Sequence, residues 1–183
     1  SEALKLCSTG NTTTAVGARA LYAQTTAQEN VAVGHQAGNA ITTGSDNTLV
    51  GSNCGMTATT DAGLTAVGKS ALQSSTGSFN TAVGVSALGA VTGNHNVAMG
   101  RNTGNNNTSI NYCVAIGDYA LDAAGTGDSN IAIGYNAMTA NTGGGDNVAI
   151  GVKALESNTT GEQNVSIGEQ SMENNTCLLY TSP

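Results

Sequence analysis

Short apolar clusters recur along the whole chain at nearly constant spacing, and each cluster ends at a glycine. The clusters read Thr-Ala-Val-Gly or Val-Ala-Ile-Gly, and in most copies an Asn precedes them. Successive glycines are separated by 17, 17, 17, 16, 16, 17, 17, 17 and 17 residues. Ten copies in this register indicate a repeat architecture. The glycines are Gly17, Gly34, Gly51, Gly68, Gly84, Gly100, Gly117, Gly134, Gly151 and Gly168.

The three residues before each glycine predict a short β-strand. Counting the glycine as position 0, β-branched residues at −3 and −1 share one side of the strand, and the residue at −2 faces the other. A strand this short needs a copy of itself as a neighbour. The pattern therefore predicts an all-β fold, a parallel β-solenoid (β-roll) of about ten 17-residue turns, roughly 50 Å long. The alternative is a helix–turn–helix solenoid built on Gly-x-x-Ala-Leu, which the β-branched residues and the Thr-Gly turns disfavour.

Two columns are expected to be structural. The glycine column predicts a positive φ or a close backbone approach at position 0. Position −4 is Asn in seven of the ten units, which predicts a ladder in which each amide bonds the next along the axis. The alternative is that these Asn residues only start turns. They are Asn30, Asn47, Asn80, Asn96, Asn130, Asn147 and Asn164.

Small Ala residues dominate position −2, where a solvated face would carry polar residues. Ala there predicts close packing against another surface. That surface is either the opposite wall of the same roll, built from segments such as Ala71-Leu72, or another copy of the chain. Apolar residues on both strand faces favour trimers or bundles.

The composition agrees with a thin core and excludes several classes of function. The chain has 25 Gly, no Trp and only 9% charged residues, and its larger apolar residues are mostly the repeated Val and Ile. With a net charge of −7 and five basic residues, neither nucleic acid nor an anionic membrane is an expected partner. No apolar stretch approaches the roughly 20 residues that span a bilayer, so no membrane insertion is expected.

No catalytic, metal or cofactor site is expected. The four Cys residues lack metal-type spacing. His35 and His95 are expected to be exposed turn residues without a repeated partner, so no enzyme constellation is present. Gly143-Gly144-Gly145-Asp146 has the form of a calcium-solenoid repeat once only. The other acids also fall in turns, as at Asp46, Asp128 and Glu162.

Two surface patterns give further hypotheses. Arg19, Lys69, Arg101 and Lys153 all follow a column glycine by one or two residues, and Tyr119 and Tyr135 share that edge. This edge is either a solvated rim or a stripe that contacts an anion or a surface glycan. Pairs of Thr recur in register and suggest ice binding, although they lie beside turn glycines; the pairs are Thr25-Thr26, Thr42-Thr43, Thr59-Thr60 and Thr159-Thr160.

The ends of the sequence carry their own predictions. Residues 1–176 form the repeat array, and Ser1 to Leu4 fit positions +1 to +4, so we expect a fragment of a longer array. Residues 177–183 depart from the repeat and match one reading frame of a transposase-type sequencing adapter. They are predicted to be a non-biological tail of a translated metagenomic read; the alternative is a genuine C-terminal cap.

The repeat Asn-Thr-Ala-Val-Gly-x-x-Ala-Leu, seen at Asn80–Gly84 and Asn147–Gly151, resembles repeats of bacteriophage tail fibres and related bacterial surface proteins. It is also similar to the shorter repeats of trimeric autotransporter adhesin heads. The resemblance covers residues 1–176. It implies a left-handed parallel β-roll, often a homotrimer, on a cell surface or virion.

We therefore expect a structural fibre or adhesin segment that serves host or surface attachment. The first alternative is a subunit that stacks end to end into an extracellular filament, because solenoid ends expose strand edges. The second alternative is an ice-binding β-solenoid.

Overall fold

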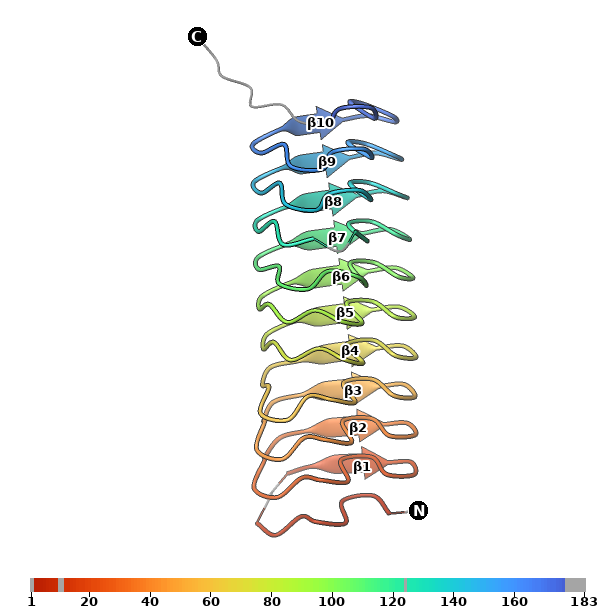
Figure 1. Cartoon of the computed structure of the whole chain (residues 1–183). Helices are drawn as coiled ribbons and strands as arrows, with labels where there is room; N and C mark the ends of the chain where they lie inside the picture. The colour runs from red at the N-terminus through yellow and green to blue at the C-terminus, as the bar shows by residue number, and fades with distance from the viewer. Residues whose placement is uncertain (1, 10–11, 124, 177–183) are drawn as a thin grey trace.

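The protein is an all-β rod of stacked turns (Figure 1). The computed structural model describes residues 2–9, 12–123 and 125–176, so the predicted adapter tail, residues 177–183, lies outside the described part. No helix occurs in these residues, and the helical alternative is wrong. The strands are β1 (Thr14–Val16), β2 (Val31–Val33), β3 (Thr48–Val50), β4 (Thr65–Val67), β5 (Thr81–Val83), β6 (Val97–Met99), β7 (Val114–Ile116), β8 (Ile131–Ile133), β9 (Val148–Ile150) and β10 (Val165–Ile167).

Ten strands form one parallel sheet in chain order, and each residue pairs with its equivalent one turn later. Ala15 pairs with Ala32 across a 17-residue step, and Ala66 pairs with Ala82 across a 16-residue step. The register therefore survives both turn lengths. Nine steps of about 4.8 Å give a sheet about 43 Å high.

Backbone hydrogen bonds also join the turns outside the strands. The amide of Gln36 donates to the carbonyl of Ala18 at 2.9 Å, and the amide of Thr42 donates to that of Thr59 at 2.8 Å. Such bonds recur around the circumference of every turn. They satisfy backbone groups that the short strands would otherwise leave unpaired.

The winding of each turn depends on several left-handed backbone positions. Besides the column glycine, these positions lie five residues before it and two and four residues after it, as at Glu29, Gln36 and Leu21. Residues with side chains are strained there, since positive φ is uncommon for them. The repeated hydrogen bonds and packing hold these residues in place. The sequence pattern predicted a positive φ at the glycines only.

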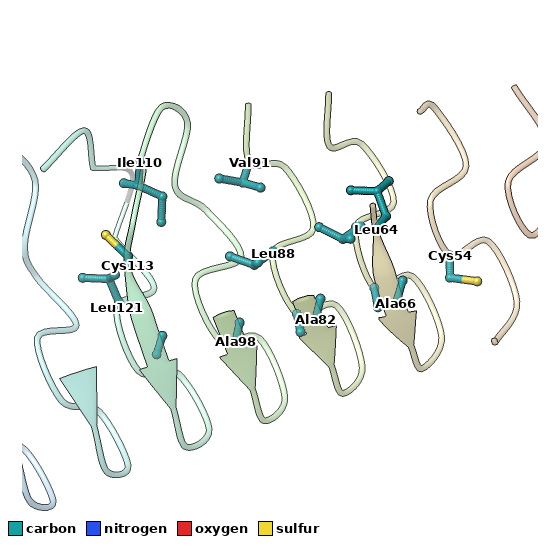
Figure 2. Packing of buried hydrophobic residues seen from close by; sticks show 14 of the residues in the cluster. Cys54, Leu64, Ala66, Ala82, Leu88, Val91, Ala98, Ile110, Cys113 and Leu121 are labelled. Carbon is teal, nitrogen blue, oxygen red and sulfur yellow. The ribbon is translucent and has the colours of Figure 1, made fainter. Parts of the chain in front are cut away.

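The core lies between the strand and the opposite wall of the same turn. Figure 2 shows Ala66, Ala82 and Ala98 pointing from their strands into this space, which Leu64 and Leu88 share. All five side chains are essentially buried. The prediction that the roll's own opposite wall covers the Ala column is confirmed, and the alternative that a second copy covers it is wrong.

The outward residues of the strands reverse another expectation. The Val and Ile residues of the strands, expected to fill the thin core, point to solvent, and Val67 is 38% exposed. Outside the strands, Ile41, Val91 and Ile110 are buried in the core. The space inside is instead occupied by Ala, by buried Asn and, in most turns, by Leu or Met at position +4. The sequence pattern was ambiguous because both sides of the strand are apolar.

One turn shows how tightly the core is filled. β3 carries Leu49 where most strands have Ala, and two of the opposing +4 positions are Gly38 and Gly55. A Cβ at Gly38 would lie 2.8 Å from Leu49 Cδ1, and one at Gly55 would lie 3.0 Å from Leu49 Cδ2. The larger side chain on one wall is therefore matched by missing side chains on the other, as expected of a close-packed interior.

Candidate functional site

The outward side of the sheet is the largest regular surface of the rod. Its residues come from positions −3 and −1 of all ten strands, and every one of them is Thr, Val, Ile or Met. No charged side chain interrupts this apolar sheet face. Its members are partly exposed, with Val50 at 37%, Met99 at 45% and Ile167 at 65%. Contiguous apolar surface of this kind marks an interaction site in most soluble proteins.

The apolar sheet face changes along the rod. Position −3 is Thr in β1, β3, β4 and β5, and Val or Ile in every strand from β6 to β10. The face is therefore more polar towards β1 and entirely aliphatic, apart from Met99, towards β10. Thr and Val have similar shapes, so the surface stays flat while its polarity falls.

The glycine column lies at the end of the strands, where the backbones of successive turns approach closely. Its φ values run from 121° to 143°, a region that disfavours side chains. A Cβ at Gly84 would lie 2.3 Å from the carbonyl oxygen of Gly100, and one at Gly34 would meet Gly51 at the same distance. Both the conformation and the space at position 0 require glycine.

The seven column Asn residues are buried and bonded to the neighbouring turn. Asn147 donates to the carbonyl of Gly161 at 2.8 Å, and its Oδ1 accepts from the backbone amide of Asn164 at 2.9 Å. Its Nδ2 also lies 3.2 Å from Asn130 Oδ1. The amide-to-amide contacts of a ladder are present at Asn96, Asn147 and Asn164, while the other bonds of the column join side chain to backbone. Each Asn thus fixes the next turn from inside the roll.

The three remaining units have Thr13, Leu64 and Cys113 at the Asn position. The Cys113 thiol lies 3.4 Å from the backbone nitrogen of Asn130 and replaces the amide oxygen as acceptor. Burial raises the pKa of Cys113 to about 11 and that of Cys54, which lies on the opposite wall, to about 12. Their thiolate forms are suppressed near neutral pH, so these thiols are unreactive. They contribute to the packing of the core.

The edge that follows the glycine column holds most of the predicted basic and aromatic residues. Arg101 lies 3.5 Å from Asp118 and 5.0 Å from the ring centre of Tyr119, which meets Tyr135 edge to face at 6.4 Å. Three of the four predicted basic residues therefore contact acids or rings. Arg19 lies over Tyr22, Arg101 has the contacts above, and Lys153 binds two carboxylates.

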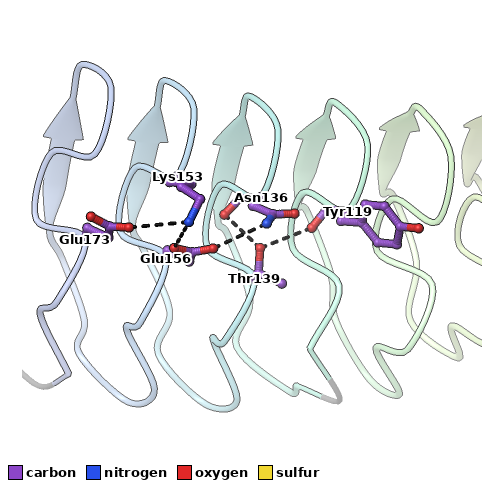
Figure 3. Close-up of polar contacts among 6 residues, drawn as sticks. All are labelled: Tyr119, Asn136, Thr139, Lys153, Glu156 and Glu173. Carbon is purple, nitrogen blue, oxygen red and sulfur yellow. Dashed lines mark hydrogen bonds and ion pairs between the residues drawn. The ribbon is translucent and has the colours of Figure 1, made fainter.

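Farther along this edge the charges neutralise one another (Figure 3). Lys153 contacts Glu156 at 3.1 Å and Glu173 at 3.5 Å, and Asn136 donates to Glu156 at 3.3 Å. These side chains are only partly buried, so the pairs contribute little stability. Because Arg101 and Lys153 already have carboxylate partners, this edge has the character of a solvated rim more than of an anion-binding stripe.

The predicted Thr columns lie at a corner and bond to the backbone. The Oγ1 of Thr25 donates to the carbonyl of Thr42 at 3.1 Å, Thr42 donates to Thr59 at 3.1 Å, and Thr159 donates to Thr176 at 2.9 Å. These hydroxyls are engaged along the axis rather than arrayed on the flat sheet. This placement weakens the ice-binding hypothesis for the Thr pairs.

The two His residues have different surroundings. Both are exposed, as expected, but His95 has a ring partner on each side, and the expectation that it lacks a repeated partner is wrong. The signal was present in the sequence, because Phe79, His95 and Tyr112 hold the same position in three consecutive units.

Within residues 2–9, 12–123 and 125–176, no group of three or more His, Cys, Asp or Glu side chains could hold a metal ion. The same part of the chain contains no helix of the length and apolarity needed to cross a membrane. No protein-family model, no curated protein and no solved structure matches this chain.

Proposed function

We propose that this chain is a structural segment of an extracellular fibre or adhesin, of the type found in phage tail fibres and bacterial surface proteins, and that it serves host or surface attachment. The observation that carries the proposal is the uncharged apolar sheet face, which runs uninterrupted from β1 to β10. Residues such as Val67 and Ile150 are exposed in the single chain, and association would remove them from water.

A second copy of the same chain is the partner that fits this face best. The face repeats once per turn along the axis, and another copy has the same repeat and the same lack of charge. Flat, long and regular surfaces of this kind pack against their own copies in closed symmetry. The resemblance of the repeat to tail fibres and adhesin heads favours three copies around the axis, and the apolar sheet face of each would point inward.

The test is the mass of the chain in solution by light scattering, together with negative-stain imaging. We expect a trimer of short rods. The double variant Val67→Glu/Val83→Glu places two charges on the apolar sheet face and should yield monomers that keep the β-type circular dichroism spectrum. The matched control Thr60→Glu/Thr76→Glu adds the same charges to exposed turn residues of the same two units and should remain trimeric.

The other outcomes discriminate between the alternatives. Long filaments would indicate end-to-end stacking in place of a trimer. A wild-type monomer at every accessible concentration would contradict both assemblies. Thermal hysteresis from such a monomer would favour ice binding.

A further inference from the structure

Three aromatic side chains form a continuous stack on the corner that precedes the strands. Phe79, His95 and Tyr112 lie five residues before Gly84, Gly100 and Gly117. Their ring centres are 5.1 Å and 5.2 Å apart, and the ring planes differ by 9° and 3°. All three have φ between 58° and 60°, so one backbone geometry directs the rings in the same way. We call these three residues the aromatic stack.

The aromatic stack extends over a fourth turn that carries no side chain at this position. A Cβ at Gly63 would lie 2.6 Å from Cδ1 of Phe79, so the Phe79 ring covers this glycine. Elsewhere the same position holds polar residues such as Asp46, Ser129 and Asp146. Because polar residues satisfy the same backbone position, folding of the turn does not explain the aromatic rings.

The aromatic stack is open to solvent. Phe79 is 56% exposed and Tyr112 is 65% exposed, in a chain with only 3% aromatic residues. Ring centres about 5 Å apart exceed the ~3.5–4.0 Å contact distance between carbon atoms, so the rings are offset like the steps of a staircase. Each step leaves part of a ring uncovered.

The two short turns coincide with this site. Phe79 and His95 lie in the two 16-residue units, which have one residue fewer in the turn before this corner. The omitted residue corresponds to the second Thr of the longer turns, and that Thr is exposed at Thr26, Thr43 and Thr60. The chain is therefore shortened where it would otherwise stand beside the stack.

A row of polar side chains borders the rings. Asn94 Oδ1 accepts from the amide of Ser78 at 2.8 Å, and Asn111 Oδ1 accepts from the amide of Asn94 at 2.9 Å. Asp128 continues the row at 2.7 Å from the amide of Asn111. Across the described turns this corner has no Lys or Arg at the positions of the rings or of the row. An anionic ligand would find no Lys or Arg partner here.

We propose that the aromatic stack and the adjoining Asn row bind an uncharged linear polysaccharide that lies along the rod, with one sugar ring per turn. Sugar rings have apolar C–H faces that pack on aromatic surfaces, and their hydroxyl groups bond to amides. The spacing of the stacked rings is close to the length of one sugar unit in an extended chain. The proposal names a class of ligand for the attachment role proposed above, and it rests on that role. It requires no association of chains.

The test is native electrophoresis of the whole chain through gels that contain a dissolved polysaccharide. The probes are hydroxyethyl cellulose, galactomannan and dextran as uncharged chains, and hyaluronate as an anionic chain. We expect at least one uncharged polysaccharide to retard the protein and hyaluronate to have no effect. Tyr112→Ser and Phe79→Ser should each weaken the binding about tenfold or more. Ser is the natural residue at this position at Ser129, so the fold should tolerate it.

Tyr135→Ser is the matched control, because it removes an exposed ring from the opposite edge and should leave the retardation unchanged. The proposal is overturned if no uncharged polysaccharide retards the protein, if hyaluronate alone does, or if Tyr135→Ser abolishes the effect and the stack variants do not. Light scattering on the same variants separates the two proposals: a loss of association in Tyr112→Ser would make the stack an interface between copies and overturn the inference.

Discussion

The two sides of each strand differ in a way that is unusual for a folded protein. Inside the roll the strand carries Ala, as at Ala82 and Ala98, and these residues are buried completely. Outside it carries the larger Val and Ile, as at Val67 and Ile150, which remain more than a third exposed. The narrow interior sets the size of the inner residue, whereas the outer residues follow the preference of strands for β-branched side chains and the needs of a partner surface.

Gly84→Ala, directly after β5, should have the largest effect on stability, because it disturbs the backbone on which both sides of the strand depend. Gly84 is partly exposed, yet its Cβ would meet the backbone of the next turn at 2.3 Å and its φ is 135°. We expect the free energy of unfolding to fall by about 4 kcal/mol, as backbone strain and overpacking act together. Denaturant unfolding of the chain measures this loss.

Two other glycines separate the two causes. Gly168→Ala has the same kind of φ, 121°, but its nearest neighbour would be 4.0 Å away, so it should show the conformational part alone. Gly143→Ala has an ordinary φ and a nearest atom at 3.9 Å, so its stability should barely change. Equal losses in all three variants would contradict the steric explanation.

Ala82→Leu tests the inner side directly and should have the next largest effect. Leu72 and Leu88 already occupy the opposing wall, so the added methylenes overpack the core and cost about 2–3 kcal/mol. Val83→Leu, at the neighbouring outward position, should change the stability of the monomer by less than about 0.5 kcal/mol.

A rescue variant sharpens the same comparison. Ala82→Leu/Leu72→Gly/Leu88→Gly copies the arrangement of Leu49 with Gly38 and Gly55 and should recover part of the lost stability. Since the residues at +4 have positive φ, glycine fits the backbone there. A triple variant less stable than Ala82→Leu alone would show that the pairing at Leu49 is not a general rule of this core.

Much of the fold follows from the repeat alone. The unit predicts a strand of three to four residues before each glycine, and the strands, such as Thr65–Val67 and Val148–Ile150, are the three residues before their glycines. The sequence pattern does not settle which side of the strand faces inward. Alternation places Ala66 and Val67 on opposite sides, and both are apolar, so either side could face the core. It also missed the left-handed conformation at Leu88 and Tyr112, which tertiary hydrogen bonds impose on residues that do not prefer it.

The surfaces were less predictable than the fold. The register predicts that Arg101 and Tyr119 share one edge, but their mutual contact and the ion pair with Asp118 depend on side-chain geometry. The aromatic stack can be read from the shared register of Phe79, His95 and Tyr112, but His95 taken alone gives no signal of it.

The smallest expected effect concerns two carboxyl groups on or near the inner side. Burial raises the pKa of Asp61 and of Asp122. A carboxyl group whose pKa is raised by folding stabilises the folded state only in its protonated form. This stability is fully present below the ordinary pKa near ~3.9 and is lost as the pH rises through the folded pKa. Asp61→Asn/Asp122→Asn should therefore be slightly more stable than the wild type at neutral pH, and the gain should vanish near about pH 4.

Thermal unfolding at both pH values measures this difference between the variants. Asp46→Asn removes a carboxylate from an exposed turn and controls for the change in net charge. A double variant less stable than the wild type at neutral pH would contradict a burial penalty at these positions.

The hydrogen bonds between turns also determine how the rod responds to force. They run parallel to its axis, so a pull on the two ends loads the ladder of the outermost turn before that of any other. Because each turn contacts only its neighbours, the rod should come apart by peeling, one coil after another, instead of giving way as a whole. Each coil would release 17 residues, about 60 Å of extended chain at roughly 3.5 Å per residue. Such a rod would lengthen in small, repeatable increments under load and dissipate mechanical work one coil at a time.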